Sequence, residues 1–182
     1  MPKDSSQPPS INPTAAALAA PAAAPEHVEV DRLLDQMDRV FRAEAWHGAS
    51  LLQLLAPVTA ATAVRRPLPS RHSIWELTTH ITAWIDIARE RLAGEWVDVT
   101  HEMDWPAVPQ EPADAVSGLE RAWRETVGGL ERAWIALETN VRTLDDRSLR
   151  RRVKGCPYTA YILVHGVIQH LVYHAGQIAL LS

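Results

Sequence analysis

Two histidines, His170 and His174, lie four residues apart in the apolar run HLVYHAGQIALL near the C-terminus. Side chains four residues apart project from the same face of an α-helix. Four apolar residues fall on the same stripe by 3.6-residue periodicity, so both imidazoles are predicted to point into the core: Leu163, Val167, Ile178 and Leu181. A buried imidazole without a hydrogen-bond partner is destabilising. The pair therefore requires polar partners, a shared proton or a metal ion.

A third imidazole for the same site has to come from another segment. His165 precedes His174 by nine residues, which places it about half a turn away around the helix. His80 is the strongest candidate, because it shares a predicted helical stripe with Leu77 and Trp84. Three protein ligands and one open position are typical of a catalytic zinc-type site.

The other four histidines have no comparable orientation. They are predicted to lie in loops, at helix starts or beside the N-terminal tail: His27, His47, His72 and His101. The spacing alone is equally compatible with a metal site and with core histidines that hydrogen-bond to one another.

The segments that must position these histidines show the periodicity of helices. Apolar residues recur at spacings of three and four over 30–41, and a break at 45–50 precedes a shorter apolar segment over 51–58. The helix that carries His80 is predicted to start at Ser73, which fits a capping box with Glu76, and to end at Gly94. The capping role is the favoured interpretation of Glu76.

The second half of the chain contains a long connection and two further helices. Residues 95–111 are predicted to form a long loop with tryptophan anchors, followed by a helix from near Pro112. The hexapeptide GLERAW occurs there twice, eleven residues apart, so Trp123 and Trp134 are expected on one side. The last helix is predicted to start near Thr159. Since no segment alternates like a strand, we predict an all-α bundle of four or five helices.

Composition narrows the classes of function. With 47% apolar residues the chain can form a sizeable core, and its net charge of −4 argues against a general nucleic-acid-binding protein. The single cysteine, Cys156, excludes an intrachain disulfide and fits a reducing cytoplasm. No apolar run approaches the ~20 residues of a membrane helix. We therefore predict a cytoplasmic protein without a membrane or nucleic-acid partner.

Residues 1–27 are rich in Pro and Ala and are predicted to form a disordered tail. The segment AAALAAPAAAP offers small-residue cleavage sites, but a single basic residue precedes it and Pro21 interrupts it, which disfavours an export signal. The predicted domain spans residues 28–182.

Four segments together resemble the DinB-like superfamily, which includes YfiT-type metal-dependent hydrolases and thiol-dependent transferases. They are WHGASLLQLL (46–55), HSIWELTTHITAW (72–84), RLAGEW (91–96) and HGVIQHLVYHAGQIALL (165–181). The resemblance implies a four-helix bundle of up-down-down-up arrangement with a bound divalent metal. It also implies one histidine ligand on the second helix and two on the last, at the positions of His80, His170 and His174.

Three neutral imidazoles would leave a divalent ion, here Zn, Ni or Fe, with an open coordination position. A bound water would then favour hydrolysis, whereas a bound low-molecular-weight thiol would favour transfer of that thiol. Gln177, three residues after His174, is expected either to orient that ligand or to pack in the core. No catalytic residue is assigned. The alternative is a non-catalytic metal-binding or structural bundle, and either protein could form a homodimer.

Overall fold

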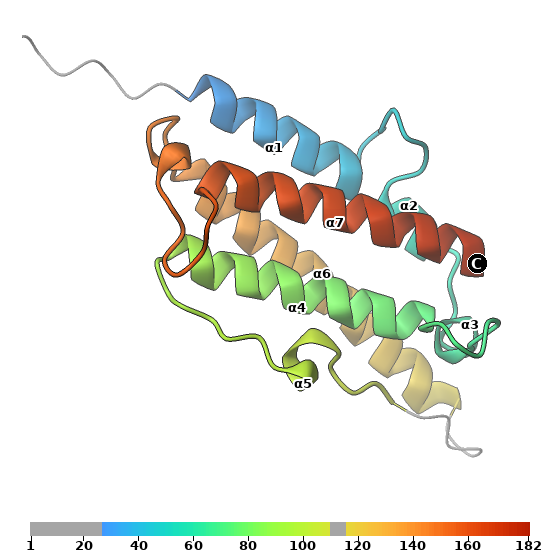
Figure 1. Ribbon diagram of the computed structural model, residues 1–182. Helices are drawn as coiled ribbons and strands as arrows, with labels where there is room; N and C mark the ends of the chain where they lie inside the picture. Colours follow the sequence, from blue (N-terminus) through green and yellow to red (C-terminus); the bar gives the residue numbers. More distant parts are fainter. Residues whose placement is uncertain (1–26, 110–115) are drawn as a thin grey trace, which may run out of the picture.

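Four long helices form a bundle: α1 (Val28–Phe41), α4 (Ile74–Leu92), α6 (Val116–Arg142) and α7 (Ala160–Leu181). The computed structural model describes residues 27–109 and 116–182. Figure 1 shows α1 and α7 running in one direction and α4 and α6 in the other, which confirms the up-down-down-up arrangement. Both α1 and α4 pack against α6 and α7. Because α4 and α6 run in parallel, the chain between them must return along the length of the bundle.

Short helices occupy the connections. They are α2 (Leu51–Leu55), α3 (Ala60–Val64), α5 (His101–Asp104) and the 3-10 turn η1 (Ser148–Arg150). The prediction of a continuous loop over 95–111 is wrong at α5, which begins where Thr100 Oγ1 accepts the Met103 N–H at 3.3 Å. A threonine N-cap of this kind stabilises even a single helical turn.

The predicted ends of α4 are confirmed by their local chemistry. The Glu76 N–H donates to Ser73 Oγ at 3.2 Å, and the Ser73 N–H donates to Glu76 Oε2 at 2.8 Å. Gly94 follows the helix with a φ of 94°, which favours glycine. Glu76 is therefore committed to the cap, where Arg66 also pairs with its carboxylate.

The two tryptophans of the GLERAW repeat point from α6 into the core of the bundle. Trp134 stacks on Phe41 of α1, with ring centres 4.8 Å apart, whereas Trp123 packs against Trp75 of α4 at 5.2 Å. Both indoles are buried, as their shared helical face predicts, but they serve different helix contacts. The repeat thus has a packing role, holding α6 against two neighbours.

Two sequence predictions lie outside the described residues. These are the tail over 1–27, of which only His27 is described, and the helix start near Pro112, since the described part of α6 begins at Val116. The last helix begins after Thr159, as predicted. The Thr159 Oγ1 accepts the Ile162 N–H and so caps the helix. Among the described helices, none combines the length and the apolar character needed to cross a bilayer.

Candidate metal centre

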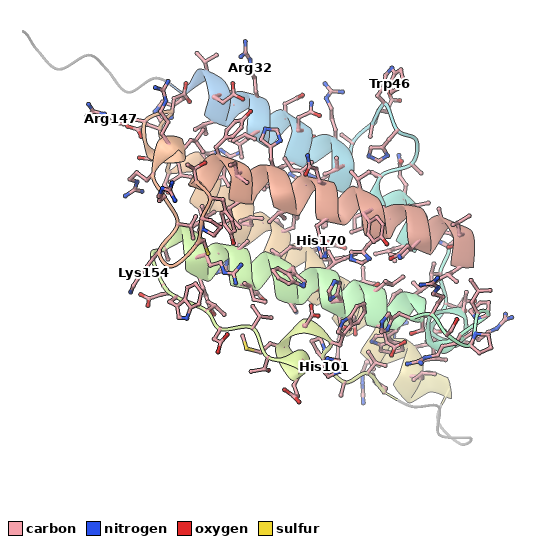
Figure 2. All side chains as sticks on the ribbon, in the orientation of Figure 1. Arg32, Trp46, His101, Arg147, Lys154 and His170 are labelled. Carbon is pink, nitrogen blue, oxygen red and sulfur yellow. The ribbon has the colours of Figure 1, made fainter. Side chains whose placement is uncertain are left out.

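Helices α4 and α7 bring three histidines together in the middle of the bundle. His80 Nε2 lies 3.0 Å from His170 Nε2, and His174 Nε2 lies 2.9 Å from the same atom. His80 and His174 are buried, and His170 is half-buried and points into the space between α7 and α4 (Figure 2). His165 stands apart, with its ring against Tyr161. The three imidazoles selected from the sequence are therefore the three that converge.

Hydrogen bonds at the far side of two rings determine which nitrogen carries the proton. His80 Nδ1 lies 2.6 Å from the backbone carbonyl oxygen of Asp104, and His174 Nδ1 lies 2.6 Å from Gln177 Oε1. Both oxygens accept, so both Nδ1 atoms donate. Each ring consequently presents an unprotonated Nε2 toward His170. Gln177, left open by the sequence as either an orienting or a packing residue, makes the contact expected of an orienting residue.

This donor set suits a divalent cation. His170 Nε2 carries at most one hydrogen, which it can donate to only one of its two neighbours. Without a metal ion, the other neighbour would therefore direct its nitrogen lone pair at His170 Nε2 from about 3 Å with no hydrogen between them. Two nitrogens bound 2.0–2.1 Å from a zinc ion are about 2.8–3.4 Å apart at octahedral or tetrahedral angles. The two observed nitrogen separations of 2.9 and 3.0 Å lie within that range. The three-histidine group can therefore hold a metal ion.

Burial keeps these imidazoles in the form that binds metals. Removal from water lowers the pKa of His80 and of His174, and it lowers the pKa of His170 to about 4. The neighbouring imidazoles add to the effect at His170, because a second positive charge would be repelled. All three rings are thus neutral near pH 7, and no proton needs to be displaced from a charged ring when a metal binds.

The connection after α4 covers one side of the cluster. The Asp104 carboxylate accepts the Trp84 indole N–H at 2.7 Å and lies 3.2 Å from His80 Nδ1. The Trp105 indole stacks between His80 and His72, with ring centres 4.0 and 3.5 Å away and nearly parallel planes. These contacts fix the orientation of His80 and shield it from water.

The sequence predicts Trp105 only as a loop anchor and gives no signal for the contact between Asp104 and His80. A signal for the short helix itself was available: Thr100 followed by acidic residues and then Pro106 is the start and stop pattern of a short helix. The pattern would have placed α5 in the connection, although not its contact with His80.

A cavity of about 470 Å³ opens beside the cluster. His80 and His170 form one end, and Arg91 and Tyr158 line it further along. Apolar groups make up most of the wall between them: Trp84, Ile87, Ala88, Ile162, Leu163, Gly166 and Val167. A small molecule in this space would reach the histidines while most of its surface is removed from water.

The sequence matches the family model of the DinB superfamily over residues 44–178. The matched region contains α4, the connection with α5, α6 and most of α7, and therefore all three clustered histidines. No curated protein and no solved structure matches the chain. The family model covers well over half of the sequence, and the chain belongs to the DinB superfamily.

Proposed function

We propose that the protein binds one divalent metal ion, Zn, Ni or Fe, through the Nε2 atoms of His80, His170 and His174. It uses this ion on a small molecule in the adjacent cavity, as a transferase of low-molecular-weight thiols or as a hydrolase. The observation that carries the proposal is the convergence of three Nε2 atoms. In His80 and His174 the proton is on the hydrogen-bonded Nδ1, so the Nε2 lone pair is free to bind a metal.

The chain's own residues would bind and orient the reactants. A divalent ion, when bound, supplies Lewis acidity that lowers the pKa of a water or thiol coordinated to it. Asp104 and Gln177 hold two of the imidazoles in the required tautomer, and Trp105 excludes water from one face of His80. The apolar cavity wall strengthens electrostatic interactions inside it, because few water molecules screen them.

One observation favours the alternative, a non-catalytic bundle that dimerises. Four large apolar side chains on α7 are exposed: Tyr161, Ile162, Tyr173 and Leu180. A second copy could cover them. The cavity favours an enzyme instead, since structural zinc sites are typically closed by four protein ligands. Light scattering tests dimerisation, and a dimer without any small-molecule binding would favour the alternative.

Metal analysis of freshly purified protein tests the proposal. We expect about one divalent ion per chain in the wild-type protein, with strong loss in each of the variants His80→Ala, His170→Ala and His174→Ala. His165→Ala is the matched control, because this imidazole lies on α7 outside the cluster. Equal metal content in the control and the three ligand variants would overturn the assignment.

The choice between transferase and hydrolase needs a second measurement. A cobalt-substituted protein titrated with a small thiol should develop a thiolate-to-cobalt absorption band if the thiol reaches the ion. A metal-loaded protein that never shows this band would exclude the thiol transferase and leave the hydrolase.

A further inference from the structure

The far part of the cavity contains a cation, Arg91, that lies three helical turns after His80 on the same face of α4. Its Nη1 donates to the Tyr158 hydroxyl at 3.0 Å, and its Nη2 donates to the Val97 carbonyl oxygen at 3.2 Å. These bonds fix the guanidinium in place. Both partners are uncharged, so neither neutralises it.

No carboxylate of the described residues lies within ion-pair distance of Arg91. The neighbouring arginine of α4, Arg89, does have such a partner, with its Nη1 2.7 Å from Asp86 Oδ1. A guanidinium offers five N–H groups, and Arg91 uses two of them. Each Nη atom therefore retains one N–H that can donate to a carboxylate oxygen.

Tyr158 adds a third donor beside Arg91. Burial raises the pKa of its phenol, so the hydroxyl keeps its proton at neutral pH. Its oxygen accepts from Arg91, and its own hydrogen, which has the Cys156 thiol as a neighbour, can turn toward a stronger acceptor such as a carboxylate. Arg91 and Tyr158 both line the cavity.

A single indole separates this cation from the histidines. The guanidinium carbon of Arg91 lies 5.8 Å from the Trp84 ring centre, which in turn lies 5.7 Å from the centre of the His170 ring. The guanidinium carbon of Arg91 therefore lies no farther from the centre of the His170 ring than these two distances added together. A molecule with only a few bonds between its two polar ends would therefore reach both.

Exposed basic residues continue the positive charge outward from Arg91. Arg151, Arg152 and Lys154 line a second depression together with Arg91. They lie where α4 ends and α7 begins, the end of the bundle at which Figure 2 labels Lys154. None of these three forms an ion pair with another described residue. Such a patch attracts small anions toward the cavity.

We propose that the substrate of this site carries a carboxylate, which binds Arg91 and Tyr158 while the reacting end of the molecule lies at His80 and His170. The inference rests on the proposed function and adds the class of its substrate. The apolar wall between the two ends favours a molecule with a short hydrocarbon middle. Asp104 does not oppose this arrangement, because its carboxylate lies at the histidine end and is held by Trp84 and His80.

A matched pair of probes tests the carboxylate site: 6-mercaptohexanoate and 6-mercaptohexan-1-ol, which differ only in the charged end. Their dissociation constants would be measured by calorimetry on cobalt-loaded protein under anaerobic conditions. We expect the wild-type protein to prefer the acid by about tenfold to a hundredfold, the range for hydrogen bonds to a charged group. Arg91→Met should abolish this preference while leaving the affinity for the alcohol within about twofold.

Two further variants separate recognition from structure. Arg91→Lys keeps the charge and should retain part of the preference, even if the loop contacts at Val97 and Tyr158 loosen. Arg89→Met removes the same charge from the same helix outside the cavity and should leave the preference unchanged. Circular dichroism would confirm that each variant is folded.

The outcomes distinguish this inference from the proposed function. Equal affinities in the wild-type protein, a preference that survives Arg91→Met, or no binding of either probe would overturn the carboxylate site. If neither thiol produces a cobalt absorption band, the thiol transferase fails instead, and the calorimetric preference still decides the role of Arg91.

Discussion

Replacing Gln177 by leucine would remove the acceptor that holds His174 in its metal-ready tautomer. Gln177 Oε1 lies 2.6 Å from His174 Nδ1, and the imidazole is buried. Leucine is similar in size, so packing at this half-buried position should be largely kept. Without the acceptor, the ring either leaves Nδ1–H unpaired or moves the proton to Nε2, where a metal would have to displace it.

The expected loss follows from the strength of that hydrogen bond. A neutral hydrogen bond contributes about 0.5–1.5 kcal/mol, and one to a charged group about 1.5–3 kcal/mol. Binding of a divalent ion polarises the imidazole, so the bond strengthens from the first range toward the second when the site is loaded. Zinc affinity should therefore fall by about tenfold to a hundredfold, as is typical when the partner of a metal-bound histidine is removed.

Competition with a chromophoric chelator measures this change. Gln169→Leu is the control, because the same substitution at this exposed position of α7 removes no contact to the cluster. Gln177→Glu should restore the affinity, since a carboxylate also accepts from Nδ1. If Gln177→Leu binds zinc within about twofold of the wild-type protein, the tautomer argument is refuted.

Three other perturbations test the site and its surroundings. In protein stripped of metal, the free energy of unfolding measured with urea should be level above about pH 7.5, where the histidines of the unfolded chain are also neutral. It should fall by about 2 kcal/mol toward pH 4, because the unfolded chain takes up a proton that the lowered pKa of His170 denies the folded state. Trp105→Ala should expose His80 and destabilise the fold by about 2 kcal/mol in the same urea assay, and an unchanged stability would show that the stacked indole is dispensable. Gly155→Ala should lower stability by about 1–3 kcal/mol, since φ is 72° there and a Cβ would overlap Trp96; adding Trp96→Ala should recover only the part due to overlap.

Helical periodicity was sufficient to select the three histidines but not to bring them together. It placed His80 on the inner face of α4 and His170 and His174 on the inner face of α7. His80 and His170 are 90 residues apart in the sequence, and their 3.0 Å contact depends on how the side chains of α4 and α7 interdigitate. For the histidines, the family resemblance and the folded geometry agree.

The supporting contacts were harder to predict because they come from outside the periodic segments. The contact of Asp104 with His80 depends on where the connection docks against α4, and no local pattern encodes that position. Arg91 was accessible in principle, since eleven residues after His80 is close to three full turns. However, a charged residue in the last turn of a helix is usually solvated. The sequence alone therefore gives no reason to expect Arg91 to face a cavity.

The parallel course of α4 and α6 has an evolutionary consequence. The described part of the chain after α4 runs back along the bundle and places Asp104 and Trp105 against His80. The crossing segment contributes little to the core, so substitutions and insertions there are tolerated more readily than in the long helices. The three histidines and the segment that packs over His80 would thus be inherited on separate parts of the chain. Relatives could vary the crossover, and with it the contacts made by Asp104 and Trp105, while the three histidines stay where they are.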